Sequence, residues 1–322
     1  MPLDSNGITI HPATRDDHRA LLAFLIEQYP QLGWSEPYME WQYYRNPAGV
    51  AKSWVAKHEG KLIANYTAIP HALSVDGKIQ PSWRVQDVIT HPEYRGMGLY
   101  ARVSDEATRF LQNGTFPLNF TFPNENSHPG FMKRNWFAAQ RIPLWTGSPS
   151  GRISTQLDAE PISAFQEQDA EVWKAYKTGV RYGVERSAAY LNWKYFQNPR
   201  GGYSAFRLTS VGARAVCVLK LFDKGAGEKF AHLCDLFYEP GFSAISEAVA
   251  FFKVFAQDRG ATACSAWSPP QSALAAQLHE FGFQLQTALA RWFVLNHSPA
   301  LQHSEVENFA NWHLSMGDSD VY

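Results

Sequence analysis

Cysteine is scarce in this chain, with three in 322 residues. Cys217, Cys234 and Cys264 lie far apart, and none of them has the close spacing of a zinc site or a redox motif. They also do not form the even framework of a disulfide-stapled secreted protein. We therefore expect each to be a small buried apolar residue, in a cytoplasmic protein that holds no metal.

Long hydrophobic runs and an excess of charge are absent as well. No apolar stretch reaches the roughly 20 residues of a membrane span, and no N-terminal signal pattern appears, so we expect no membrane insertion. The formal net charge of −1 gives no general attraction to nucleic acid. With 45% hydrophobic and 18% charged residues, the 322-residue chain has the composition of an ordinary globular protein and is long enough for about two domains.

The stretch from Val85 to Val103 carries the strongest local signal. Its first residues, Val85–Thr90, predict a strand, and apolar residues at helical spacing predict a helix that begins after Gly98. In such a strand–turn–helix, Gly96 and Gly98 allow close approach of a ligand, and the first helical N–H groups suit a phosphate. A tight turn that only needs glycine explains the same residues. The loop is neither a Walker A loop nor a dinucleotide fingerprint, because no Gly-Lys-Ser/Thr and no third glycine follow.

This loop resembles the coenzyme A pyrophosphate loop of the GNAT acyltransferases, in which Gln/Arg-x-x-Gly-x-Gly/Ala follows a strand. Arg95, Gly98 and Tyr100 take the pattern positions, and Tyr100 departs from the usual small residue. A second block, Asn119–Asn124 and then Asn126–Trp136, resembles the next strand and the helix that flanks the pantetheine. The resemblance implies a mixed α/β (α+β) sheet. It also implies acetyl-CoA or another acyl-CoA as cosubstrate, bound by Val88, Ile89, Thr90, Arg95, Gly96, Met97, Gly98, Leu99, Tyr100, Asn124, Ser127 and Phe131.

The second half of the chain repeats the first. Tyr38–Pro47 recurs as Tyr190–Pro199 with five identical positions. Leu233–Pro240 stands where the Val85 strand should be, and helix and strand patterns follow at Ile245–Phe255, Ala263–Ser268 and Ala273–Phe283. This order indicates two copies of one fold.

The second copy lacks the glycine loop, because no Arg-x-x-Gly-x-Gly follows Pro240. It therefore cannot hold a pyrophosphate in the same way. We expect two tandem GNAT-like domains. The first, residues 1–148, carries the coenzyme A site, and a degenerate second, residues 152–322, forms part of the acceptor cleft.

Acyl transfer from a thioester to an amine needs a base. Strand alternation places Asp87 on one face with Trp83, Val85 and Ile89, and a carboxylate on an apolar face has a raised pKa if it is unpaired. We rank Asp87 first, although a buried pairing explains it equally well and a bulge would change its facing. His71 ranks second because its ordinary pKa suits base work, and hydrogen-bonded packing is its alternative.

The family resemblance also bears on the acid. Many members place a Tyr near the sulfur, and the matching position here is Phe131. The resemblance thus implies that no side chain protonates the thiolate at that position, which leaves water, Ser127 or the acceptor. Asn124 could orient pantetheine amides or water, or it could close a turn at the strand end.

The C-terminal tail, with Asn311-Trp312 and Gly317–Asp320, resembles that of a GNAT branch linked to surface-polysaccharide synthesis. In that branch, tandem GNAT proteins acylate a nucleotide-linked dideoxy-amino sugar. The resemblance implies a dTDP-amino sugar as acceptor, an acetyl or 3-hydroxyacyl donor, and substrate contacts by Trp312, Asp318 and Asp320. A solvated acidic end explains the aspartates as well. Two further hypotheses are an enzyme that acts on another small amine or a peptide, and a non-catalytic acyl-CoA-binding module.

Overall fold

The chain forms two compact units, each built on a mixed sheet with helices. The computed structural model describes residues 7–112, 116–134, 136–151, 155, 157–225, 227–286, 292–299 and 301–320. The first unit comprises Met1–Ala72, Gln80–Gln140 and Trp292–His303, and the second comprises Leu73–Ile79, Arg141–Arg291 and Ser304–Tyr322. Within the described ranges, no helix has both the length and the apolar character needed to cross a membrane.

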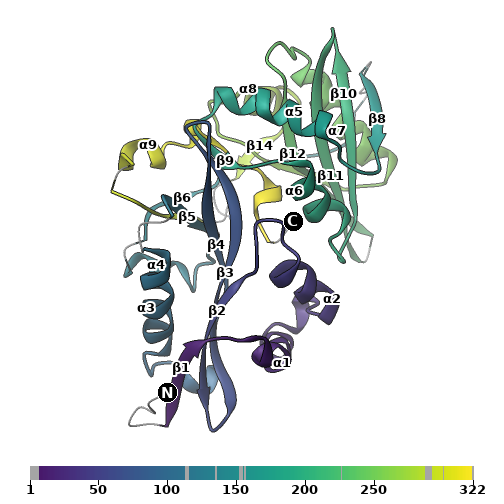
Figure 1. Cartoon of the computed structure of the whole chain (residues 1–322). Helices are drawn as coiled ribbons and strands as arrows, with labels where there is room; N and C mark the ends of the chain where they lie inside the picture. The colour runs from purple at the N-terminus through teal and green to yellow at the C-terminus, as the bar shows by residue number, and fades with distance from the viewer. Residues whose placement is uncertain are drawn as a thin grey trace. The chain divides into compact units, whose positions relative to one another are not determined.

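The sheet of the first unit has the strand order β1-β2-β3-β4-β5-β15-β6. Figure 1 shows α1 and α2 on one side of β2–β4, and α3 and α4 on the other. The elements are β1 (Ile8–Pro12), α1 (His18–Gln28), α2 (Glu36–Met39), β2 (Lys52–His58), β3 (Lys61–Val75), β4 (Lys78–Thr90), α3 (Leu99–Leu111), β5 (Leu118–Thr121), α4 (His128–Met132), β6 (Phe137–Arg141) and β15 (Trp292–His297).

The core of the first unit lies between this sheet and α3. Leu99, Val103, Ala107 and Leu111 recur at helical spacing on α3, so they share one face and are buried. Part of the same cluster comes from β4 and α4, including Trp83, Val85 and Phe131. The apolar residues whose spacing predicts the helix are thus the residues that pack α3 against β4.

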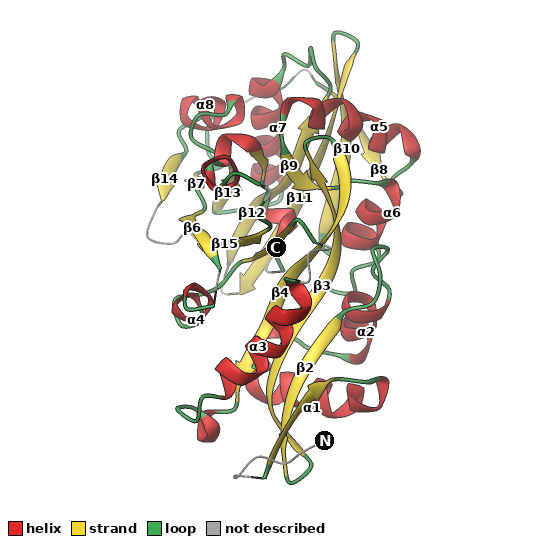
Figure 2. Ribbon diagram, turned by 60° about the vertical axis from the view of Figure 1, so that its left-hand side comes forward, coloured by secondary structure: helices red, strands yellow, loops and turns green. Residues whose placement is uncertain are grey.

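The sheet of the second unit has the order β8-β10-β11-β12-β13-β7-β14, which repeats the first sheet position by position. Its helix α7 lies against these strands (Figure 2) and packs into a buried cluster with them. Trp173 of α5 contacts Phe237 of β12. The elements are β7 (Leu144–Gly147), β8 (Asp158–Ile162), α5 (Glu167–Tyr176), β9 (Tyr182–Val184), α6 (Ala188–Leu191), β10 (Tyr203–Ser210), β11 (Ala213–Gly225), β12 (Glu228–Tyr238), α7 (Ile245–Asp258), β13 (Ala263–Trp267), α8 (Ala273–Glu280) and β14 (Gln284–Gln286). The chain then continues through α9 (His303–Glu307) and β16 (Trp312–His313), which pairs in parallel with β9.

Each unit includes a strand from the other half of the sequence. β7 pairs with β13 and β14 in the second unit, and β15 pairs with β5 in the first. The expected domains, 1–148 and 152–322, are contiguous, whereas these units are not.

The sequence between Trp136 and Trp145 also predicts a strand pair, and the exchange corrects this expectation. Strands β6 and β7 do form there, but they belong to different sheets. Only Ile142 and Pro143 separate them. A two-residue hairpin needs positive φ at one or both turn positions, which neither a β-branched residue nor proline supplies readily.

Other expectations are confirmed. The helix, strand and helix predicted after Pro240 appear as α7, β13 and α8 in the expected order. Cys217, Cys234 and Cys264 are all buried, and burial raises the pKa of each thiol, as expected for apolar core residues.

Candidate active site

The glycine loop joins β4 to α3 as predicted. Gly96 and Gly98 have φ of 81° and 70°, in the left-handed region that favours glycine. The loop residues Arg95–Gly98 are exposed, and Arg95 is anchored by a hydrogen bond from its Nε to the Thr90 carbonyl at 3.3 Å. Gly98 is the N-cap of α3, and the first turn of that helix contains no acidic residue. Its N–H groups and Arg95 therefore form a donor set that fits an anionic pyrophosphate.

β4 extends beyond its parallel neighbour β5 at its C-terminal end. The two strands pair at Arg84–Phe120 and Val85–Thr121, where β5 ends, while β4 runs on to Thr90. Thr121 marks the end of the pairing by donating from Oγ1 to the Val85 carbonyl at 2.9 Å. Val88, Ile89 and Thr90 thus lie on a part of β4 that extends beyond β5, next to the glycine loop.

Asp87 does not face the side that alternation predicts. Its φ is 51°, an unusual value for a residue other than glycine. After it, Val88 packs against the cluster that contains Trp83 and Val85, so the alternation shifts by one residue at this point. The expectation that Asp87 shares the apolar face of Trp83 and Val85 is therefore wrong, and the cause is this local irregularity.

Asp87 instead contacts Tyr43 in a buried polar network. The Tyr43 hydroxyl donates to Asp87 Oδ2 at 2.8 Å, and Gln86 Nε2 donates to the same oxygen at 2.7 Å. Asn65 Nδ2 holds the Asp87 backbone carbonyl at 2.7 Å. Burial, followed by the charge of Asp87, raises the pKa of Tyr43 well above its usual value, so the phenol stays protonated and acts as a donor.

A single π-helical turn, Glu40–Tyr44, brings Tyr43 to this position. Such turns are rare and occur often at functional sites. Tyr43 and Ser53 also line a cavity of about 300 Å³ in the first unit, together with Arg15, His18 and Tyr44. Ser53 Oγ is 2.7 Å from Thr67 Oγ1, which lies 3.3 Å from the Tyr43 hydroxyl, so the cavity wall connects to Asp87 through hydrogen bonds.

The structure places the other predicted residues of the first unit in different roles. His71 is 2% exposed, and its ring packs 5.5 Å from that of Phe120. Phe131 is a core residue against Trp136, at 5.2 Å between rings. Asn124 Oδ1 accepts from the backbone N–H groups of Asn126 and Ser127, both at 3.0 Å, so it closes a turn. The roles predicted for these side chains in ligand binding or catalysis stay predictions.

Tyr100, the departure from the family pattern, is accommodated by a glycine on α4. A Cβ added to Gly130 would lie 2.6 Å from a ring carbon of Tyr100. The Tyr100 ring also packs edge-on against Phe131. The large side chain in the first turn of α3 therefore depends on the absence of a side chain at Gly130.

We expect the change Gly130→Ala to destabilise the first unit by about 1–3 kcal/mol, because the added methyl group overlaps a rigid ring. The loss of stability is measured by urea unfolding, followed through hydrogen exchange of the α3 amides. Gly179→Ala is the control, since its Cβ would meet nothing within 4 Å. Equal unfolding midpoints for the two variants would show that the Tyr100–Gly130 contact is not tight.

The predicted residues of the tail make contacts within the second unit. Asp318 is 1% exposed, and its Oδ1 is 2.8 Å from Arg186 Nη2. Trp312 is buried against Tyr182 and donates from Nε1 to the Val306 carbonyl at 2.8 Å. Asp320 is half-buried and accepts from Ser319 Oγ at 3.4 Å. That these residues bind substrate stays a prediction.

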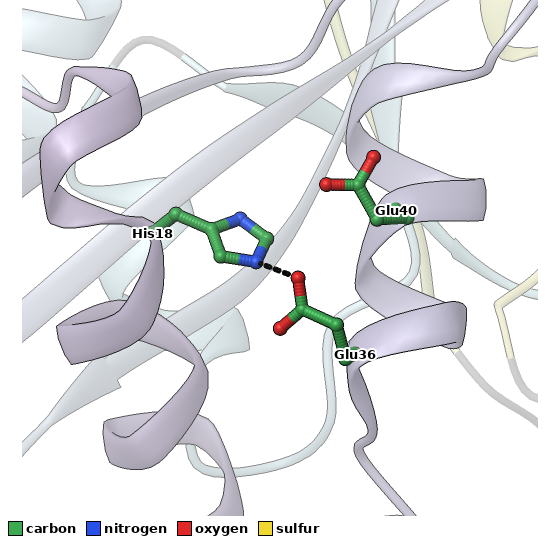
Figure 3. Close-up of side chains that lie close together, drawn as sticks. All are labelled: His18, Glu36 and Glu40. Atoms are coloured by element: carbon green, nitrogen blue, oxygen red, sulfur yellow. Dashed lines mark hydrogen bonds and ion pairs between the residues drawn. The ribbon is translucent and has the colours of Figure 1, made fainter.

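One group of ionisable side chains in the first unit has atoms close enough to suggest a metal (Figure 3). The candidate ligand atoms of His18, Glu36 and Glu40 lie within 4.8 Å of one another. However, His18 already uses Nε2 toward Glu36 at 2.7 Å and Nδ1 toward the Tyr44 hydroxyl at 3.2 Å. Glu40 is paired with the Arg15 guanidinium, whose charge opposes a cation. We interpret the group as an ion-pair network between α1 and the helical segment after it.

Tyr43 was missed by the sequence reasoning, although a signal for it was present. It is one of the five positions that are identical between Tyr38–Pro47 and Tyr190–Pro199. Its counterpart Tyr195 lies in a matching π-helical turn and donates to Asp235 Oδ2 at 3.0 Å. The repeat thus preserves a tyrosine–aspartate pair in both units.

Comparisons with known proteins agree with this geometry. Residues 9–136 match the family model of the acetyltransferase (GNAT) domain. No curated protein matches the chain.

Several solved structures are similar across both units. A GCN5-related N-acetyltransferase from Anabaena variabilis has a TM-score of 0.68 at 16% identity and covers 89% of this chain and 72% of its own. A conserved protein of unknown function from Enterococcus faecalis gives 0.68 at 13% identity, with the same coverage. N-myristoyltransferase from Saccharomyces cerevisiae, solved with myristoyl-CoA, gives 0.56 at 12% identity and covers 92% and 84%. Residues 9–136 therefore match the GNAT acetyltransferase domain, and the chain as a whole shares its fold with these structures.

Proposed function

We propose that the first unit transfers an acyl group from acyl-CoA to an amine. The observation that carries the proposal is the exposed glycine loop at the N-terminus of α3, which follows β4 directly beyond the Asp87–Tyr43 pair. Arg95, Gly96, Gly98 and the first N–H groups of α3 would hold the pyrophosphate. The acceptor amine would enter the cavity lined by Tyr43 and Ser53.

In this proposal Asp87 accepts a proton from the ammonium form of the acceptor. The neutral nitrogen then forms a bond to the acyl carbon, the carbon–sulfur bond breaks, the nitrogen releases its second proton to solvent, and the thiolate takes a proton from solvent. Tyr43 positions the Asp87 carboxylate through the 2.8 Å hydrogen bond. Backbone N–H groups of β4 beyond the end of β5 would stabilise the charge that develops on the acyl oxygen.

The glycine loop gives the first test. We expect Gly98→Ala to weaken coenzyme A binding by about tenfold, because a residue with a Cβ at a φ of 70° costs about 1–2 kcal/mol. Isothermal titration calorimetry with coenzyme A measures the affinity, and Gly179→Ala is the matched control. Equal affinities in the two variants would argue against this loop as the coenzyme A site.

For the acceptor, we propose the amino group of a nucleotide-linked amino-dideoxy sugar, in surface-polysaccharide synthesis. Support for this class comes from the resemblance of the tail, not from the contacts of Trp312 and Asp318. The test is thiol release from acetyl-CoA and 3-hydroxyacyl-CoA with dTDP-linked 3-amino and 4-amino dideoxy sugars. Release that depends on the sugar would support the proposal.

If thiol is released only with polyamines, amino acids or peptides, the acceptor is one of these amines and not a sugar. Coenzyme A binding without release from any amine would instead favour a non-catalytic binding module.

A further inference from the structure

The second unit contains a cavity that the C-terminal segment helps to build. It has a volume of about 160 Å³ and is lined by aromatic residues, among them Tyr176, Tyr238, Trp267 and Trp312. Asp235 and His313 form part of its polar lining. A cavity of this size holds a molecule with a single six-membered ring.

A chain of hydrogen bonds links three of the lining residues. His313 Nε2 is 2.9 Å from Asp235 Oδ1, and His313 Nδ1 is 3.2 Å from the Tyr176 hydroxyl. The other carboxylate oxygen, Asp235 Oδ2, accepts from Arg186 Nε at 3.1 Å and from the Tyr195 hydroxyl at 3.0 Å. The aspartate is thus held from both sides.

The charge of Asp235 determines the direction of these hydrogen bonds. Burial alone would raise the pKa of Asp235, but the Arg186 guanidinium and His313 overcome this effect and hold the pKa below its ordinary value. An ionised carboxylate can only accept, so His313 donates from Nε2 to Asp235. The Tyr176 hydroxyl, 3.2 Å from His313 Nδ1, is thereby held as a hydrogen-bonding group at the cavity wall.

The same aspartate is the counterpart of Asp87 in the first unit. Asp235 lies on β12, which takes the sheet position of β4, and Tyr195 corresponds to Tyr43. In the second unit, however, Gly317 of the tail packs directly against the Tyr195 hydroxyl and the Cys234 carbonyl, where no Cβ would fit. The repeated tyrosine–aspartate pair here serves to hold His313, and through it Tyr176.

We propose that this cavity is a second small-molecule site, for a compound with one six-membered ring that bears a hydroxyl or amino group. The aromatic rings provide apolar and stacking contacts with the ring of the ligand. Its O–H or N–H group forms a hydrogen bond with the Tyr176 hydroxyl. The proposal does not depend on acyl transfer in the first unit.

The test uses three fluorinated probes of the same shape, 4-fluorophenol, 4-fluoroaniline and 4-fluorotoluene. Their affinities are measured by fluorine NMR titration of the full chain without coenzyme A. We expect the phenol and the aniline to bind about 5- to 10-fold more tightly than the toluene, as one hydrogen bond predicts. Tyr176→Phe should remove this preference while the ring remains.

A blocking variant provides the second arm. Ala310 lies at the cavity and is exposed, so Ala310→Phe should fill the space and abolish binding of all three probes. Ala276→Phe, at an exposed position of α8 outside the cavity lining, should bind them as the wild type does. The proposal is overturned if the wild type binds none of the probes, binds all three equally, or if the preference survives in Tyr176→Phe. Binding that persists in Ala310→Phe would place the probes elsewhere and overturn it too.

Discussion

Replacing Asp87 with Asn should lower kcat for acyl transfer by about 10²- to 10⁴-fold, the usual contribution of a general base. The amide keeps the shape of the carboxylate but cannot accept the proton of the amine. Because Asp87 precedes the glycine loop and is not part of it, the KM for acyl-CoA should change by less than about threefold. Steady-state thiol release over a range of pH measures both effects.

Two comparisons make this result interpretable. Asp158→Asn is the matched control, because Asp158 is exposed on β8 and should leave the rate unchanged. Tyr43→Phe removes the hydrogen bond to Asp87 but not the carboxylate, so its loss should be smaller, about 3- to 10-fold. An Asp87→Asn enzyme with the wild-type rate and pH profile would remove Asp87 from the mechanism.

Replacing Asp235 with Asn should destabilise the second unit by about 3 kcal/mol, because the buried Arg186 then keeps one carboxylate partner, Asp318, among the described residues. Both Arg186 and Asp235 have fully buried side chains, so water cannot replace the lost interaction. Hydrogen exchange of β12 amides in increasing urea reports on this unit. The control is Asp76→Asn, which breaks an exposed pair with Arg181 and should cost less than about 1 kcal/mol.

The same change should alter the response to acid. The pKa of Asp235 is lowered in the folded protein, so its contribution to stability is present above the unfolded pKa of about 3.9 and is lost as the pH falls further. Below about pH 4, the wild type should therefore lose more stability than Asp235→Asn. Equal urea midpoints for Asp235→Asn and Asp76→Asn would show that the Arg186–Asp235 pair contributes little to the stability of this unit. The same conclusion would follow if Asp235→Asn and the wild type lost equal stability in acid.

Local signals predict the elements around the glycine loop well. Gly96 and Gly98 have the positive φ that glycine favours, and the apolar spacing from Leu99 to Leu111 matches the buried face of α3. Each of these features depends on residues close in sequence. The match of residues 9–136 to the GNAT acetyltransferase domain supports the resemblance of the glycine loop to that family, and not the finer branch.

The side of β4 to which Asp87 points could not be predicted from strand alternation. Nothing in the sequence marks an aspartate that adopts a positive φ. The contact with Tyr43 is formed across 44 positions of sequence. Comparison of the two repeats would have singled out Tyr43 and Tyr195, since both halves retain the tyrosine and the aspartate.

The pairing of β7 and the burial of the tail also depend on residues that are distant in the sequence. Nothing in Leu144–Gly147 itself indicates pairing with β13, whereas Ile142–Pro143 before it does argue against a hairpin. From the sequence, a solvated acidic end is one interpretation of Asp318. Its burial depends on Arg186, a residue remote in the chain.

The most direct test of Asp87-dependent acyl transfer uses a labelled acetyl group, carried from acetyl-CoA to an amine acceptor, with the wild type and Asp87→Asn assayed side by side. We expect label on the nitrogen of the acceptor with the wild type and at least about a 10²-fold slower transfer with the variant. Equal transfer by both proteins, or no transfer to any amine by a wild type that binds coenzyme A, would contradict it.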